Sequence, residues 1–131
     1  MWAAGVRDLA GLVELDNIGT PGHELTGVEA AQAIAAGTIT SEALVHACLE
    51  RIMAREESVR AWEYLDPKAA LTQARMRDHS PAQGPLHGVP IALKDLCFTK
   101  GIATAAGMPM HCGFLPAFDG TVTSRRRHAG A

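Results

Sequence analysis

The chain has 131 residues, of which 47% are hydrophobic and 20% are charged, and its formal net charge is -2. This composition fits one modest domain with a packed core. The weakly acidic balance argues against nucleic acid and anionic lipid as partners, because both select a clear basic excess. No stretch approaches the roughly 20 apolar residues of a membrane span. Three cysteines cannot all pair within one chain, so we expect reduced thiols and a cytoplasmic protein.

The N-terminal stretch is expected to be a lead-in. Residues 1–23 end in the turn-rich "NIGTPGH", and the apolar residues ahead of it suffice only for a short amphipathic helix. The stretch "TGVE", which begins at Thr26, has the Ser/Thr-x-x-Glu form of a capping box. It predicts a helix over residues 27–36, which Gly37 ends.

Three further elements follow. A helix begins at Thr40 or Ser41, because apolar residues then recur at helical spacing. The stretch "VRAWEYL", residues 59–65, alternates and is rich in aromatic and branched residues, which predicts a strand. In "DPKAALTQARMRD", Asp66 is placed to cap a helix whose first residue is Pro67.

The second half of the chain combines a strand, a long loop and a helix. The consecutive apolar residues of "VPIALKDL", residues 89–96, predict a buried strand with both faces covered. Residues 99–120 are rich in glycine, proline and small residues, which is typical of a loop that builds a site. Asp119 is placed to cap a final helix through "TVTSRRRHA". The order helix, helix, strand, helix, strand, helix predicts an α/β layered fold with parallel crossings.

One stretch resembles a known family. "GPLHGVPIALKDLCFTKGIATAAGM", residues 84–108, is similar to the N-terminal motif of the amidase signature family, in which a strand ends in Lys-Asp and a loop of small residues follows. Residues 24–66 are similar to that family's opening helices, and "PAFDGTVTSRRRHAGA" is similar to a later helix that ends in Ala-Gly-Ala. The resemblance covers residues 24–131. It implies the N-terminal helices and first strands of an amidase-signature mixed-sheet fold, incomplete as given.

The resemblance assigns one catalytic residue, Lys94. In the family this lysine acts with two serines, one of them in a cis peptide, to activate a serine nucleophile that attacks an amide carbonyl. The implied reaction converts a carboxamide to a carboxylate and ammonia. The scheme needs a neutral lysine, and partial burial at the mouth of an apolar strand favours that form. Without the motif, such a lysine is most often a solvated terminus or a partner for an acid such as Asp95. Asp95 itself is expected to tie down loop amides.

The family's nucleophile is missing from this sequence. It lies on a glycine-rich turn downstream of the Ala-Gly-Ala helix end, and no serine of this chain has glycines around it. We therefore expect residues 24–131 to be the N-terminal part of an amidase domain, truncated before the serine nucleophile and inactive alone. Whether the chain is itself an enzyme stays open. The serines considered are Ser41, Ser58, Ser80 and Ser124.

Two other interpretations stay open. One is a non-catalytic remnant, or an assembly piece that binds a complementary chain. The other is part of the A subunit of a glutamine-dependent tRNA amidotransferase, since the subunit that releases ammonia from glutamine shares these motifs. In the complete enzyme the partner is a small-molecule amide substrate. An exposed sheet edge at residues 89–96 would also favour self-association.

Other side chains that could bind ligands receive simpler interpretations. Cys97, His111 and Cys112 lack the spacing of a zinc site, so we expect neither a metal nor a cofactor. The arginines of "SRRRH" offset the helix macrodipole on a solvated face, so we expect no nucleic acid and no membrane as partners. Thr123 and Arg126 stand where the family usually has apolar residues, which predicts a weaker packing face for the last helix.

Overall fold

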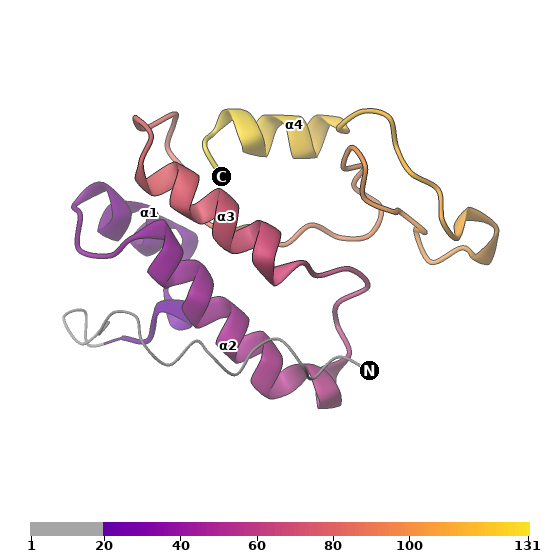
Figure 1. The fold of residues 1–131 in the computed structure, drawn as a ribbon, viewed down its shortest axis with the longest axis horizontal. Helices are drawn as coiled ribbons and strands as arrows, with labels where there is room; N and C mark the ends of the chain where they lie inside the picture. The colour runs from indigo at the N-terminus through magenta and orange to yellow at the C-terminus, as the bar shows by residue number, and fades with distance from the viewer. Residues whose placement is uncertain (1–19) are drawn as a thin grey trace.

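The structure is a computed structural model that describes residues 20–131, so most of the expected lead-in lies outside the described residues. Four α-helices, joined by extended segments and loops, make up the described part of the chain (Figure 1). None of these helices is both long and apolar enough to cross a membrane. The helices are α1 (Gly27–Ala35), α2 (Ser41–Val59), α3 (Pro67–Asp78) and α4 (Thr121–His128), and the short 3-10 turns are η1 (Gly22–Glu24) and η2 (Pro109–His111).

The start of α1 confirms the predicted capping box. The Thr26 hydroxyl accepts a hydrogen bond from the Glu29 amide at 3.3 Å, and the Glu29 carboxylate accepts one from the Thr26 amide at 2.8 Å. These bonds favour the ionised carboxylate, so the side-chain and backbone hydrogen bonds from Thr26 lower the pKa of Glu29. Gly37 follows the helix with a φ of +70°, as a terminating glycine does.

Helix α2 lies between two small apolar clusters and contributes to both. Leu44 belongs to the first cluster, which joins α2 to α1 and to Val89. The second cluster joins α2 to α3, which runs beside it (Figure 1). Fully burying a leucine contributes about 1.5–3 kcal/mol, so Leu44 and Leu49 of α2 each stabilise one of these clusters. The buried members are Ala30, Ile39, Leu44 and Val89 in the first cluster and Val45, Leu49 and Ala74 in the second.

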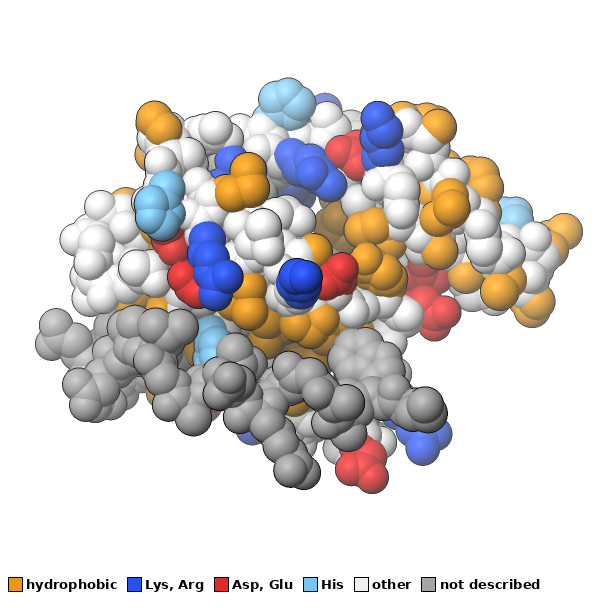
Figure 2. All heavy atoms as spheres, viewed as in Figure 1, with side chains coloured by type: hydrophobic (Ala, Val, Ile, Leu, Met, Phe, Trp, Pro, Cys, Tyr) orange, Lys and Arg blue, Asp and Glu red, His pale blue; other side chains and the backbone are white. Residues whose placement is uncertain are grey.

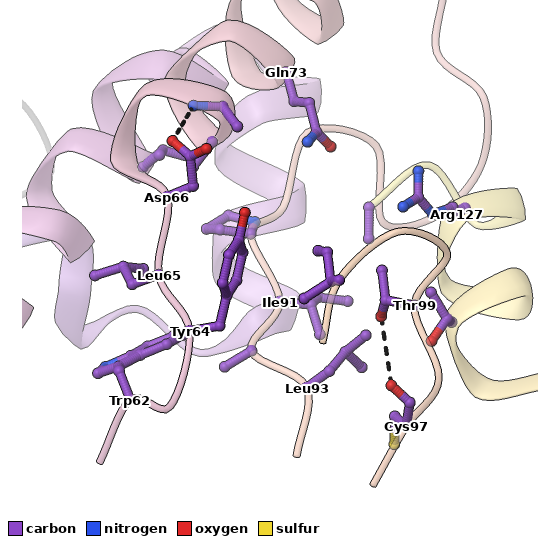
Figure 3. Close-up of a pocket in the computed structure, with 18 of the residues that line it drawn as sticks. Trp62, Tyr64, Leu65, Asp66, Gln73, Ile91, Leu93, Cys97, Thr99 and Arg127 are labelled. Atoms are coloured by element: carbon purple, nitrogen blue, oxygen red, sulfur yellow. Dashed lines mark hydrogen bonds between the residues drawn. The ribbon is translucent and has the colours of Figure 1, made fainter. Parts of the chain in front are cut away.

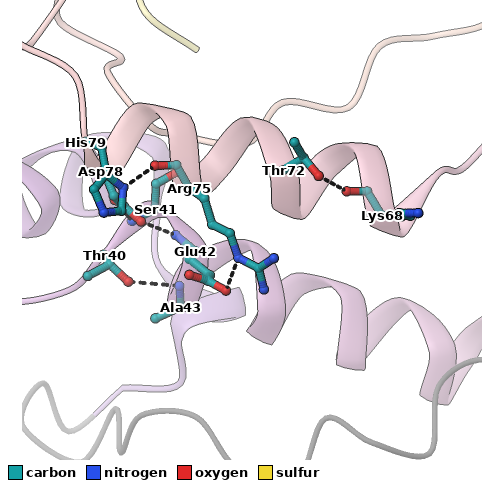
Figure 4. Close-up of polar contacts among 9 residues, drawn as sticks. All are labelled: Thr40, Ser41, Glu42, Ala43, Lys68, Thr72, Arg75, Asp78 and His79. Atoms are coloured by element: carbon teal, nitrogen blue, oxygen red, sulfur yellow. Dashed lines mark hydrogen bonds and ion pairs between the residues drawn. The ribbon is translucent and has the colours of Figure 1, made fainter.

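An acidic side chain from α3 caps the start of α2 (Figure 4). The Asp78 carboxylate accepts hydrogen bonds from the amides of Ser41, at 2.7 Å, and Glu42, at 3.0 Å. An ion pair of 2.7 Å between Arg75 and Glu42 lies beside it. A carboxylate at a helix N-terminus satisfies free amides and complements the positive end of the helix dipole. The cap therefore joins the end of α3 to the beginning of α2.

Replacing Asp78 by alanine should destabilise the fold by about 1–2 kcal/mol, because two helix amides lose their acceptor. Urea denaturation followed by circular dichroism measures this loss. Thr72→Ala, on an exposed position of the same helix, is the matched control and should stay within about 0.5 kcal/mol of the unchanged chain. Equal midpoints for the two variants would show that the cap is not stabilising.

The two predicted strands are wrong for the described residues, and with them the α/β class in this part of the chain. Helix α2 runs through Val59 and ends at Arg60, which has a left-handed φ of 51°. Residues 61–66, which bend at Glu63, and residues 89–94 are non-helical, yet neither is assigned as a strand. A strand needs a hydrogen-bonded neighbour, and residues 20–131 supply none to either segment.

Burial of the segment 89–94 also differs from the expectation. Both faces were predicted to be covered. Instead Ile91 and Leu93 are half-buried, while Ala92 and Lys94 between and after them are exposed. One face is therefore partly covered and the other is open.

The final helix is confirmed, but its predicted cap is wrong. Gly120 is the N-cap of α4 and offers no side chain. Asp119 instead accepts a hydrogen bond from the Lys100 amide at 2.8 Å and pairs with Arg127 at 3.1 Å. Thr123 does not weaken the packing face as predicted, because it is buried and its hydroxyl donates to the Phe98 carbonyl at 2.8 Å.

Candidate functional site

Lys94 lies at the end of the extended segment 89–94, directly before a turn. Its carbonyl oxygen accepts hydrogen bonds from the amides of Leu96 and Cys97, at 2.7 and 2.9 Å. The expected partial burial of Lys94 is wrong for the described chain, because the side chain is exposed. The reason is the open face of the segment, which no neighbouring strand covers within residues 20–131.

A cavity of about 510 Å³ opens beside Lys94. Lys94 and Asp95 line it, together with side chains from α2, α3 and α4. Figure 2 shows apolar side chains gathered around the hollow on this face of the molecule. Concave sites with apolar walls and a few polar groups are where proteins usually bind small molecules, so this cavity is the candidate site.

Two extended segments form opposite walls of the cavity. Figure 3 shows Tyr64, from residues 61–66, reaching toward the segment that carries Ile91 and Leu93. Tyr64 is 50% exposed, so half of this large side chain remains open to solvent. The site is therefore incompletely covered in the described chain.

A backbone junction holds the start of the lysine-bearing segment. The Gly88 amide donates to the Gly130 carbonyl at 3.0 Å, and the Gly88 carbonyl accepts from the Ser41 hydroxyl at 2.6 Å. The Leu86 amide donates to the Ala129 carbonyl at 2.9 Å. These bonds join the 84–88 turn to the start of α2 and to the end of the chain after α4.

The junction has no room for side chains at its glycines. A Cβ atom on Gly130 would lie 2.8 Å from the Cα atom of His87, and one on Gly84 would lie 2.7 Å from the Ala129 carbonyl oxygen. Gly88 is buried, has a φ of +76°, and a Cβ there would lie 3.0 Å from a Ser41 side-chain atom. Gly84 and Gly130 therefore pack directly on backbone, and Gly88 packs on the Ser41 side chain, which glycine allows because it has no Cβ atom.

Gly88→Ala should destabilise the chain by at least about 1 kcal/mol, because alanine is strained at positive φ and meets Ser41. The control is Gly27→Ala, at the first residue of α1, where a Cβ meets no atom within 4 Å. That control should leave the urea midpoint unchanged or raise it. Loss of stability in both variants alike would contradict the junction's role.

Asp95 closes the loop that follows Lys94. Its carboxylate accepts a hydrogen bond from the Ala105 amide at 3.1 Å, and its backbone carbonyl accepts one from the Ala106 amide at 2.9 Å. This confirms the prediction that Asp95 ties down loop amides. The segment with Lys94 is thus anchored at both ends, by the junction at Gly88 and by this clamp.

The serines of the chain are engaged elsewhere, as the sequence indicated. Ser41 lines the cavity, but its hydroxyl donates to the Gly88 carbonyl. The hydroxyls of Ser58 and Ser80 donate to backbone carbonyls three residues earlier, and Ser124 lies on α4. Among the described residues, no serine hydroxyl is hydrogen-bonded to Lys94, so these residues do not form a serine-lysine pair.

The cysteines and histidines do not form a metal centre in the described part of the chain. Residues 20–131 contain no group of three or more His, Cys, Asp or Glu side chains that could hold a metal ion. All three cysteines are free. Cys97 lines the cavity, Cys112 is exposed, and burial raises the pKa of the Cys48 thiol.

Alkylation by iodoacetamide at pH 8 should modify Cys112 fastest and Cys48 slowest. The thiolate is the reactive form, and a raised pKa leaves less thiolate at a given pH. Mass spectrometry of timed samples measures the three rates. In 8 M urea the rates should converge, and a Cys48 rate equal to that of Cys112 in the folded chain would contradict its burial.

Comparison with known proteins identifies the family. The model of the Amidase family matches residues 43–131. The chain belongs to the amidase family. It is 46% identical over 113 residues to the A subunit of the glutamyl-tRNA(Gln) amidotransferase of Chloroflexus aurantiacus, a match that covers 83% of this chain and 23% of the relative. It is 42% identical over 110 residues to the same protein of Streptomyces coelicolor, covering 81% of this chain and 22% of the relative.

The fold of this amidase chain is similar to that of a solved structure, fatty acid amide hydrolase. The TM-score is 0.78 at 30% sequence identity, and the match covers 84% of this chain and 20% of that one. The chain therefore spans less than a quarter of the length of the curated relatives given above. The family resemblance of the motif around Lys94 is confirmed, and the coverage is consistent with a portion of a longer amidase.

Sequence reasoning missed three residues that position the site. In the sequence Ser41 indicated only a helix start, Thr123 only a departure from the family pattern, and Gly130 was given no role in the site. The sequence does contain a glycine directly before Val89, and it has hydroxyl side chains near the starts of two helices. Their partners lie far away in sequence, however, so no local pattern indicated which groups they would meet.

Proposed function

We propose that Lys94 is the catalytic lysine of an amidase that converts a carboxamide to a carboxylate and ammonia. The observation that carries this proposal is the placement of Lys94 at the end of a doubly anchored segment, on the wall of the main cavity, inside the family match. Its role would be to accept the proton of a serine nucleophile, which then attacks the amide carbonyl.

The proposed chemistry needs more polypeptide than the described residues provide. A lysine accepts a proton only in its neutral form, and desolvation favours that form. Lys94 is exposed here. A segment that brought the serine and its oxyanion-binding amides would also cover the open side of residues 89–94. Binding of that one segment would then both bury Lys94 and supply the serine nucleophile.

We also propose that the amidase unit begins near residue 24, earlier than the family match at residue 43. Packing supports this boundary. Ala30 and Ile39 are buried in the same cluster as Val89, directly before the lysine-bearing segment. Removing α1 would expose that cluster, so residues 24–131 are proposed to be the N-terminal part of an amidase domain.

A second candidate function is favoured by the relatives. This chain is 46% and 42% identical to two proteins that are named as the A subunit of glutamyl-tRNA(Gln) amidotransferase. The amide substrate would then be that of such an amidotransferase, with glutamine as the expected ammonia source. A non-catalytic assembly piece is the remaining alternative, and it predicts association without Lys94-dependent activity.

The chain alone should show no amidase activity above background, since a general base without a nucleophile contributes little. Activity should appear when it is co-expressed with the remaining part of the Chloroflexus aurantiacus relative. In the complex, Lys94→Ala should lower kcat/KM at least about 100-fold, the lower end of what a general base supplies. Lys94→Arg should fare no better, because guanidinium stays protonated.

Lys100→Ala is the matched control, since Lys100 is also an exposed lysine but does not line the main cavity. It should keep the activity of the unchanged complex. Ammonia release from glutamine and from simple aliphatic and aryl amides separates the two candidate functions. Full activity with arginine at position 94 would refute the base assignment, and a stable but inactive complex would support the assembly piece.

A further inference from the structure

The start of α4 holds the segment that follows the lysine-bearing turn. Figure 3 shows Cys97 and Thr99, on either side of Phe98, beside the helix drawn in yellow, which is α4. Two hydrogen bonds from this helix end on one acceptor, the Phe98 carbonyl. The Gly120 amide donates to it at 2.8 Å, and the Thr123 hydroxyl donates to it at 2.8 Å. One donor is backbone and the other is a side chain, so a substitution at position 123 removes only the second bond.

Thr123 occupies an unusual position for a polar residue. Within α4, all of which the structure describes, it is the one buried residue, with 3% of its surface exposed. Its neighbour Val122 is 49% exposed. A buried hydroxyl is costly unless it is hydrogen-bonded, and the Phe98 carbonyl supplies the partner. The buried side of α4 is therefore used for a polar contact to the turn after the lysine.

Only three residues separate Phe98 from Lys94, and the backbone between them is a closed turn. The Lys94 carbonyl accepts hydrogen bonds from the amides of Leu96 and Cys97, at 2.7 and 2.9 Å. Asp95, within the same turn, is held by amides of the following loop. A shift of the chain at Phe98 therefore moves the turn that carries the lysine.

From these contacts we infer that Thr123 is a positioning residue for Lys94, because its buried hydroxyl fixes the Phe98 carbonyl and, through residues 94–97, the place of the lysine on the cavity wall. Both Lys94 and Thr123 line this cavity. The inference rests on the proposed function, since the position of the lysine sets the rate only if the lysine is the base. A base acts within about 2.6–3.2 Å of the group whose proton it accepts, and a misplacement of about 1 Å can cost about 100-fold in rate.

The Thr123 bond is not the main attachment of α4. Backbone hydrogen bonds join the end of this helix to residues 84–88, and Asp119 joins its beginning to the Lys100 amide. Thr123→Val would keep the size of the side chain, and the Phe98 carbonyl would keep its backbone donor. The substitution should therefore leave the fold intact and free the turn to move.

The chain alone gives a local test, because Cys97 lies inside the turn and lines the cavity. In Thr123→Val, iodoacetamide should alkylate Cys97 at least about threefold faster than in the unchanged chain, because the turn opens more often. Thr123→Ser keeps the hydroxyl and should restore the original rate. Thr121→Val makes the same change at an exposed position of α4 and should leave the rate unchanged. Circular dichroism checks that each variant is folded.

The catalytic test uses the complex of this chain with the remaining part of the Chloroflexus aurantiacus relative. Thr123→Val should lower kcat about tenfold and leave KM within about twofold, because a misplaced base affects the reacting complex and not substrate binding. Thr123→Ser and Thr121→Val should both keep the kcat of the unchanged complex. A purely structural role would instead reduce the amount of complex and leave kcat per assembled complex unchanged.

The contrary outcomes separate this inference from the proposed function. An unfolded Thr123→Val chain, or equal Cys97 rates in Thr123→Val and the unchanged chain, would overturn the positioning role. Unchanged kcat in Thr123→Val, in a complex that Lys94→Ala inactivates, would overturn it and leave the proposed function standing. Full activity of Lys94→Ala would refute the proposed function, whereas faster alkylation of Cys97 in Thr123→Val would still support the attachment of the turn by Thr123.

Discussion

The backbone of Gly88 is held from two sides, and the position of the candidate site depends on this contact. Its carbonyl accepts from the buried Ser41 hydroxyl and its amide donates to Gly130. Leaving such buried groups without partners costs about 1–3 kcal/mol each, so the three chain segments stay together. The start of α2, the turn before Val89 and the segment after α4 are therefore joined at this contact.

The contact at Gly88 explains how this part of the chain holds Lys94 beside the cavity without a β-sheet. The segment leaves Gly88, packs Val89 into the cluster formed with α1 and α2, and is held again at its other end by the hydrogen bonds of Asp95. Lys94 ends up on the cavity wall at a defined position. In the described chain no polypeptide covers the open face of this segment, so Lys94 stays exposed. Its desolvation would need such a cover. The proposed chemistry would need further polypeptide on this open face.

Local signals predicted the helices well and the sheet poorly. The capping box at Thr26 and the Asp66-Pro67 pair act within one helical turn, so the sequence contains all their partners. A strand depends on a neighbour that is far away in sequence, and in residues 20–131 that neighbour is absent. Asp119 was expected to cap α4, but it is drawn to the Lys100 amide and Arg127 instead. Long-range competition of this kind cannot be seen in a local pattern.

The same limit applies to the site. Lys94 was predicted from a motif and lines the cavity, and its catalytic role stays a prediction, whereas its burial could not be judged from neighbouring residues alone. The most direct measurement is a crystal structure of this chain assembled with the remaining part of the Chloroflexus aurantiacus relative. We predict a buried Lys94 whose Nζ atom lies about 2.6–3.2 Å from a serine Oγ atom of the added polypeptide. A Lys94 side chain that stays exposed, with no serine hydroxyl near it, would contradict the assignment of this lysine as the catalytic base.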